Sequence, residues 1–356
     1  MSRVMIEPAS YDNIRKSVDR AFELFPADLS GKKVLIKPNV LRTAKPEEGI
    51  TTHPALLEAV VEKVDSLGAG EIVVGDNPGM IDYGDNEKSF EKSGLMKAAK
   101  SCYRNMGTSS RKVGFNPDYM PTVSVSEDVL DADFFISLPK FKTHGLTVIT
   151  GAIKNSYGIL PGAIKAHLHK AAGSPQRFHE LLVDVFRLRI PDLIIMDAVV
   201  GMEGNGPAST ELRDIGQVLA SDNAVAMDSV VSSMMGLDPG KLRFLQKAKQ
   251  EGLGDYDPQS IQCLGEIKTF TDYHIPPLGG EANINNSAIQ ELIGNKTLLV
   301  PKVDADLCTS CENCIEHCPV GALDMGEDDI PVADSELCIT CFCCQELCPE
   351  KAITLQ

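Results

Sequence analysis

Eight cysteines near the end of this 356-residue chain repeat one spacing that suits metal ligation. Each repeat reads C-x2-C-x2-C-x3-C and is followed by proline, and the second begins thirty residues after the first. Gaps of two residues let three thiolates surround one cuboidal iron–sulfur cluster, whereas the gap of three begins a helical turn that carries the fourth thiolate toward another cluster. The spacing therefore predicts two [4Fe-4S] clusters, one held by Cys308, Cys311, Cys314 and Cys348 and the other by Cys338, Cys341, Cys344 and Cys318.

Other uses of these cysteines fit less well. Zinc sites usually contain paired C-x2-C units rather than three thiolates together and one apart. Disulfides need an oxidising compartment, and the N-terminal residues MSRVMIEPAS lack the basic and then apolar pattern of a signal peptide. No apolar run reaches the roughly 18 residues of a membrane span. We therefore expect a cytoplasmic protein without a membrane partner, in which the extra Cys343 is a non-ligand thiol.

The C-terminal segment of about 55 residues resembles the bacterial-type dicluster ferredoxins, and it is strongly acidic. Residues 301–356 contain twelve Asp and Glu and two Lys and Arg, which gives −10 of the net charge of −16. Negative charge around a cluster disfavours adding an electron, so we expect a low reduction potential. An acidic surface suits a redox partner protein with a basic docking face, although the same charge also serves solubility. It argues against nucleic-acid binding.

The first 300 residues alternate between buried strands and amphipathic helices. We predict strands at 33–37, 71–75, 133–138 and 193–199, and helices at 14–25, from Pro54 onward, at 175–189 and at 222–235. This alternation is typical of an α/β domain with a mainly parallel sheet and helices on both faces, here followed by a small α+β ferredoxin-like domain. We expect an α/β body at 1–240, an irregular cap or linker at 241–300, and the cluster domain at 301–356.

One segment of the body is unusual in charge. From Phe134 to His179 there is no Asp or Glu, but there are five lysines and four histidines. Polar loops also follow each of the four predicted strands, and such loops gather beyond the carboxyl ends of parallel strands, where α/β proteins bind ligands. Together these features indicate a crevice for a small anionic ligand, such as a carboxylate, phosphate or acyl phosphate. A solvated basic face is the alternative.

The candidate site residues lie on these loops. Lys154 and His144 are the predicted catalytic residues, because burial of Lys154 among apolar neighbours would lower its pKa. Asp76 stands at a strand end, as a possible base or partner of a lysine. The predicted substrate-binding residues are Lys37, Asn39, Lys140, Lys142, Asn155, Glu203 and Gly204. No G-x-G-x-x-G or Walker motif accompanies them.

Several motifs of the body together resemble the domain-of-unknown-function 362 family over about residues 30–240. They are Ile36-Lys37-Pro38-Asn39, Thr52-His53-Pro54, Gly75-Asp76, Leu138-Pro139-Lys140-Phe141-Lys142-Thr143-His144, Thr150-Gly151-Ala152-Ile153-Lys154-Asn155 and Glu203-Gly204-Asn205-Gly206-Pro207. Many members carry the same C-terminal dicluster module. The resemblance implies an anaerobic bacterial or archaeal source and, as the family name records, no assigned reaction.

Three functions fit these residues. The first is an iron–sulfur oxidoreductase that passes electrons through the clusters to or from an anionic substrate or cofactor in the Lys/His crevice. The second is an electron carrier or assembly module that docks a larger redox complex. The third is a non-redox lyase or isomerase that uses Lys154 and His144 and has structural clusters. We favour the first because only it uses both the clusters and the convergent lysine and histidine loops.

Overall fold

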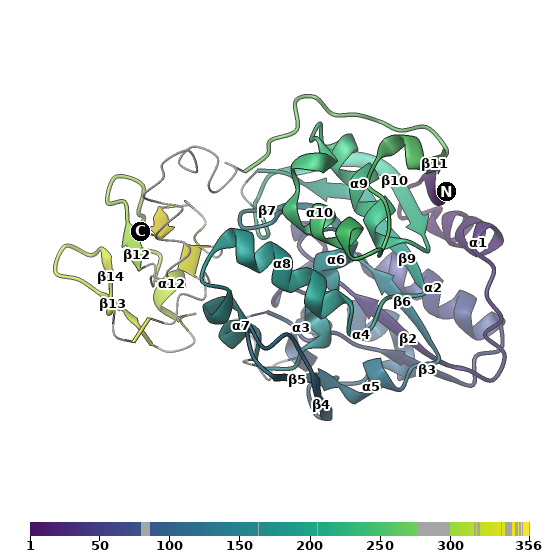
Figure 1. Ribbon diagram of the computed structural model, residues 1–356, viewed down its shortest axis with the longest axis horizontal. Coiled ribbons are helices and arrows are strands. Elements are labelled where there is room, and N and C mark those ends of the chain that lie inside the picture. Colours follow the sequence, from purple (N-terminus) through teal and green to yellow (C-terminus); the bar gives the residue numbers. More distant parts are fainter. Residues whose placement is uncertain are drawn as a thin grey trace.

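The chain folds into an α/β body and a small strand-rich C-terminal region that lies to one side of it (Figure 1). The computed structural model describes residues 1–79, 86–162, 164–204, 206–276, 300–316, 318, 321–335, 337–338, 344–345, 348, 350 and 352–355. Within these ranges, no helix has both the length and the apolar character that crossing a membrane requires.

A nine-stranded mixed sheet forms the centre of the body. Its strands are β1 (Ser2–Pro8), β2 (Lys33–Pro38), β3 (Glu71–Val74), β6 (Phe134–Leu138), β7 (Lys140–His144), β8 (Val148–Ile149), β9 (Leu193–Met202), β10 (Leu212–Ser221) and β11 (Ile261–Leu264). The order is β11-β1-β10-β9-β6-β2-β3, with β7 paired to β8 and β9. The pairs among β2, β3, β6, β7 and β9 are parallel, whereas β10 runs antiparallel to β1 and β9. The predicted mainly parallel sheet is confirmed.

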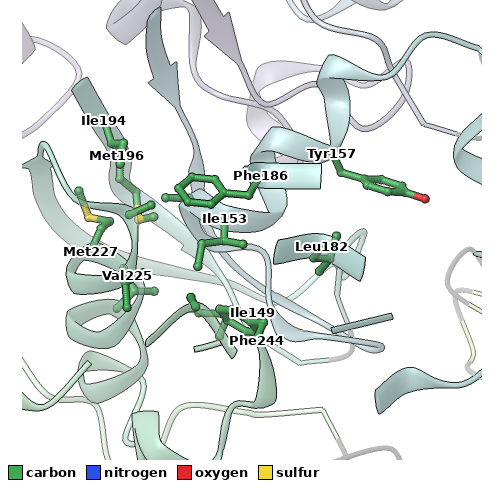
Figure 2. Packing of buried hydrophobic residues seen from close by; sticks show 14 of the residues in the cluster. Ile149, Ile153, Tyr157, Leu182, Phe186, Ile194, Met196, Val225, Met227 and Phe244 are labelled. Carbon is green, nitrogen blue, oxygen red and sulfur yellow. The ribbon is translucent and has the colours of Figure 1, made fainter. Parts of the chain in front are cut away.

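Helices cover both faces of this sheet, as predicted. One face carries α1 (Ile14–Leu24), α2 (Pro54–Ser66), α3 (Asn86–Lys92) and α4 (Leu95–Ala98), and the other carries α6 (Gly151–Asn155), α7 (Ile164–Ala172), α8 (Pro175–Phe186), α9 (Ala224–Met234) and α10 (Arg243–Gln250). Successive strand residues point to opposite faces, so in β2 Leu35 joins the α6–α10 core and Ile36 joins the α1–α4 core. Figure 2 shows the first of these cores, where Ile153 of α6 lies among side chains of α8, α9 and β9.

Shorter elements complete the described chain. The body also contains β4 (Ser110–Gly114), β5 (Thr122–Ser126), α5 (Glu127–Leu130) and the 3-10 helices η1 (Pro46–Glu48), η2 (Lys100–Cys102), η3 (Ser156–Ile159), η4 (Pro239–Lys241) and η5 (Pro258–Ser260). The C-terminal region contains β12 (Pro301–Val303), α12 (Asn313–Glu316), β13 (Leu323–Met325), β14 (Pro331–Ala333) and β15 (Ile353–Leu355).

The C-terminal region consists of two repeats, and the end of each repeat pairs with the start of the other. Strand β12 pairs with the final strand β15, and β13 pairs with β14. The amide of Asp304 donates to the carbonyl of Ala352 (2.7 Å), and thirty residues later the amide of Asp334 donates to the carbonyl of Ala322 (2.8 Å). These contacts draw the end of each repeat toward the start of the other, which is the crossing that the cysteine spacing predicts.

The body continues beyond residue 240, where the sequence suggested a cap or linker. Helix α10 buries Phe244, Leu245 and Ala248 in the α6–α10 core, and β11 adds to the sheet edge in parallel with β1. These two elements are difficult to predict from the sequence, because α10 contains many charged residues and β11 is short, so neither has a clear apolar pattern. Residues 277–299 of the expected linker lie outside the described residues.

This boundary leads to a prediction about truncation. A fragment ending at residue 276 should fold cooperatively without iron, because the body has its own two cores. A fragment ending at residue 240 should be much less stable, since burial of one large apolar side chain is worth about 1.5–3 kcal/mol and α10 contributes two. Circular dichroism and thermal unfolding of the two fragments measure the difference. A molten 276-residue fragment would show instead that the clusters hold the body together.

Candidate functional site

The four cysteines predicted for the first cluster converge in the structure. Cys308, Cys311, Cys314 and Cys348 line one cavity, with Cys348 arriving from the second repeat. Burial and the nearby sulfurs of Cys348, Cys311 and Cys308 raise the pKa of the Cys314 thiol to about 11. Cationic iron among these sulfurs would hold them as thiolates, so the donor set fits a [4Fe-4S] cluster.

The structure describes three of the four cysteines predicted to bind the second cluster. Cys318, Cys338 and Cys344 are described, whereas Cys341 and the extra Cys343 lie outside the described residues. The amide of Ala322 donates to the Cys318 sulfur (3.1 Å), and the amide of Ala352 makes the same contact with the Cys348 sulfur (3.3 Å). Such N–H···S bonds stabilise thiolate charge and help set the reduction potential of a bound cluster. Bound there, the two clusters would supply one-electron transfer.

A second site is a cavity of about 70 Å³ beyond the carboxyl ends of β2 and β3. It exceeds the roughly 10–15 Å³ that one water needs, so it has room for a small ligand. Its polar lining comes from the end of β2, the loop after β3, and the segment from α6 to α7. The polar and ionisable side chains that could contact a ligand there are those of Lys37, Asn39, Asp76, Lys154, Asn155, Tyr157, Lys165 and His169. We call this the lysine cavity.

A buried ion pair forms one wall of the lysine cavity. Lys37 Nζ lies 2.8 Å from Asp76 Oδ1, and both side chains are at most 2% exposed. Lys37 also donates to Pro38 O (3.1 Å) and Asn155 Oδ1 (3.2 Å), so all three ammonium hydrogens have protein partners. Burial lowers the pKa of Lys37 and raises that of Asp76, while their mutual attraction opposes both shifts. Lys37 therefore contributes charge and holds Asn155, but has no hydrogen left for a ligand.

Two further lysines face this ion pair. Lys165 is buried and donates to the carbonyls of Asn77 (2.7 Å) and Pro78 (2.6 Å). Burial is the main cause that lowers the pKa of Lys165 to about 7, and repulsion from Lys37 and Lys154 adds to it against the attraction of Asp76. Of the three lysines that line the cavity, only Lys154 is partly exposed. Lys154 is therefore the lysine best placed to reach a ligand.

Lys140 lies away from the lysine cavity, in a second buried ion pair. Its Nζ is 2.8 Å from Asp197 Oδ2 and 3.0 Å from the Tyr11 hydroxyl. Asp197 also accepts from the amide of His53 (2.8 Å), which is the N-cap residue of α2. Tyr11 and α2 belong to the α1–α4 face of the sheet, opposite the face that carries α6. These contacts give Lys140 a place in the fold outside the lining of the lysine cavity, and its substrate-binding role stays a prediction.

Lys142 and His144 make hydrogen bonds with backbone groups. Lys142 Nζ donates to Ile50 O (2.8 Å); burial, followed by the charges of Lys154 and Lys140, holds its pKa well below the usual range. His144 Nδ1 accepts from the amides of Leu146 (3.1 Å) and Thr147 (3.3 Å), which places the proton on Nε2. Neither residue is part of the lining of the lysine cavity.

Glu203 and Gly204 form another separate group. Glu203 pairs with Arg213 (2.8 Å), and the carbonyl of Gly204 accepts from the hydroxyl of Thr143 (2.7 Å). Of the residues predicted to share one crevice, only some line the lysine cavity. Lys37, Asn39, Lys154 and Asn155 share the lysine cavity, whereas Lys140, Lys142, His144, Glu203 and Gly204 have the other contacts described.

Comparisons with known protein families give one match in the α/β body and one in the C-terminal region. The family described as Domain of unknown function (DUF362) matches residues 34–233, which is more than half of the chain. This protein belongs to that family. A 4Fe-4S dicluster domain matches residues 300–349, C-terminal to the DUF362 match. The C-terminal domain is thus of the ferredoxin type, which carries electrons, and it has the cysteines for two [4Fe-4S] clusters.

Individual relatives cover parts of this DUF362 protein. The Thylakoid-associated protein sll1697 of Synechocystis is 32% identical over 231 residues, 63% of this chain and 68% of the relative. A Probable ferredoxin of Methanosarcina thermophila is 44% identical over 32 residues, 9% of this chain and 55% of the relative. The lactate racemase apoprotein of Thermoanaerobacterium thermosaccharolyticum matches with a TM-score of 0.40 and 14% identity, over 63% of this chain and 54% of that structure. The chain thus spans about half the length of that structure, and so low a likeness has no bearing on function.

Two residues of the lysine cavity, Lys165 and His169, were not predicted as site residues, and the sequence contained a signal for only one of them. Lys165 lies in the acid-free segment, and Lys140, Lys142 and Lys165 are at most 4% exposed, so these three lysines are not part of a solvated basic face. His169 is buried against Phe178, and burial lowers its pKa to about 3, so it is neutral at physiological pH. No local pattern marked His169 as part of a cavity, because its neighbours come from η3 and α8.

Proposed function

We propose that this protein is an iron–sulfur oxidoreductase that passes electrons through its two [4Fe-4S] clusters to or from a small anionic molecule held in the lysine cavity. The observation that carries the proposal is the lining of that cavity, where Lys37, Lys154 and Lys165 surround a single described carboxylate, that of Asp76. The ferredoxin-type domain supplies the electrons, and the DUF362 domain supplies the binding site.

The charges favour an anion as the occupant. Lys37 and Asp76 largely compensate one another, and Lys154 and Lys165 add positive charge to the same space. Repulsion between buried like charges is part of what lowers the pKa of Lys165. A carboxylate or phosphate would relieve this repulsion and would favour the protonated form of Lys165.

The side chain of Asn39 indicates that the ligand has a second polar group. Its Nδ2 donates to Asn155 Oδ1 (3.1 Å), whereas its Oδ1 is buried and has no hydrogen-bond partner among the described residues. A buried acceptor without a donor costs about 1–3 kcal/mol. A ligand with a hydroxyl or amino group beside its anionic group would satisfy Asn39 Oδ1 and interact with Lys154.

Replacing Lys154 tests this proposal. Lys154→Ala should weaken binding of phosphate or succinate about 10- to 100-fold, because a hydrogen bond to a charged group is worth roughly 1.5–3 kcal/mol. Anaerobic calorimetry of the iron-loaded protein measures the affinity, and EPR should show unchanged clusters. Lys170→Ala is the matched control, since Lys170 is an exposed lysine of the same acid-free segment.

The other outcomes separate the candidate functions. Lys154→Arg should keep anion binding but lose any proton transfer, because arginine stays protonated. Binding that survives Lys154→Ala would contradict the proposed site and would favour an electron carrier that docks a redox partner protein through a basic face. Ligand turnover without iron would favour a lyase or isomerase with structural clusters.

A further inference from the structure

We propose that Asp228 is a positioning residue that holds the short helix α6 so that Lys154 and Asn155 face the lysine cavity. This inference rests on the proposed anion binding at that cavity. It deepens the proposal by naming a residue that never touches the ligand but decides whether the ligand-binding side chains are in place.

Asp228 caps α6 from a neighbouring helix. It lies on α9 and is completely buried, and its two carboxylate oxygens accept from the amides of Ala152 (2.6 Å) and Ile153 (3.0 Å). The first amides of any helix lack partners within the helix, and one carboxylate here satisfies two of them. A helix of only five residues is not stable by itself, so its place depends on such tertiary contacts.

The chain around α6 fits closely against this carboxylate. Gly151 has a φ of +58°, and a Cβ on it would lie 2.5 Å from Asp228 Oδ1, so a side chain there would displace the carboxylate. Ile153, the next residue but one, is buried in the core shared with Phe186 and Met227 (Figure 2). The cap and this apolar anchor fix the orientation of α6, and the next two residues, Lys154 and Asn155, line the cavity.

The ionisation of Asp228 is coupled to this contact. Burial raises the pKa of Asp228 to about 7, and the amides of Ala152 and Ile153 oppose that shift. Besides burial, the groups that act on its carboxylate are these two uncharged amides of α6, whereas Ser232 on its own helix bonds only the backbone carbonyl of Asp228 (2.6 Å). Because the folded pKa lies above the ordinary value, this group's contribution to stability falls as the pH rises from about 4 to about 7. The ionised form, in turn, is the one that accepts both amides.

Two readouts test the assignment in the full-length, iron-loaded protein. Asp228→Ala should weaken phosphate binding at least tenfold and change the acylation rate of Lys154, measured by mass spectrometry with Lys170 as the internal reference. Asp228→Asn should give an intermediate effect, because its amide oxygen serves one backbone amide while its NH2 opposes the other. Ser229→Ala is the matched control, because it removes another buried hydrogen bond of α9, to Tyr256 O (2.6 Å), and should leave both readouts within twofold.

The results distinguish the two proposals. Wild-type affinity and a wild-type Lys154 acylation rate in Asp228→Ala would overturn the positioning role, as would equal losses in Asp228→Ala and Ser229→Ala. If Asp228→Ala does not fold, Asp228→Asn decides by the same two readouts. If the wild-type protein fails to bind phosphate, the proposed phosphate site fails, and the acylation rate of Lys154 still tests whether Asp228 positions that lysine.

Discussion

Protein with the substitution Cys344→Ser should contain about four iron and four sulfide per chain, whereas two [4Fe-4S] clusters give about eight of each. Cys344 is the third cysteine of the second repeat and is buried in the C-terminal core. A serine hydroxyl stays protonated at neutral pH and is a poor substitute for a thiolate, so the second cluster should be lost. Iron and acid-labile sulfide analysis of anaerobically purified protein, with EPR of the reduced form, measures this.

The adjacent cysteine is the matched control. Cys343→Ser should keep all the iron, because the spacing assigns ligation to Cys344. Cys314→Ser should lose the other cluster, so the two single variants should show different residual EPR signals. Iron loss in Cys343→Ser without loss in Cys344→Ser would instead make Cys343 the ligand.

Removal of Asp197 should destabilise the body by about 3–5 kcal/mol, because it leaves the ammonium of Lys140 buried without its counter-charge. Asp197 is fully buried and accepts hydrogen bonds from Lys140, Tyr11 and the amide of His53. For a domain of this size, such a loss corresponds to a fall in Tm of roughly 6–20 °C. Thermal or guanidinium unfolding of Asp197→Ala, under anaerobic conditions, measures it.

An exposed ion pair provides the comparison. Glu23→Ala breaks the pair with Arg20 on the surface of α1, and it should cost less than about 1 kcal/mol. The double variant Lys140→Met, Asp197→Leu should recover most of the stability, because it buries no unpaired charge. Similar losses in Asp197→Ala and Glu23→Ala would show that the buried pair has no special role.

The elements that the sequence predicted best are those with a local signal. Strands β2, β6 and β9 lie within three residues of their predicted limits, because strands of a parallel sheet buried on both faces appear as continuous apolar runs. Strands β1 and β11 had no such signal. Their place in the sheet depends on pairs such as Met5 with Ala220 and Met5 with Leu264, which lie more than 200 residues apart in sequence.

The cysteine spacing by itself predicted the ligands of both clusters, since a thiolate set two or three residues from the next can reach only a few positions around a cluster, and the structure brings the four cysteines of the first set to one cavity. The acid-free segment likewise contains Lys154 and Lys165, two of the three lysines that line the lysine cavity. Only the tertiary structure decided what each lysine does. Lys37 and Lys140 both stand at strand ends, but one is paired with Asp76 in the lysine cavity and the other with Asp197 of the neighbouring strand β9. A buried charge requires a counter-charge, and folding supplies it from whichever element lies alongside, at a distance in sequence that no local pattern records.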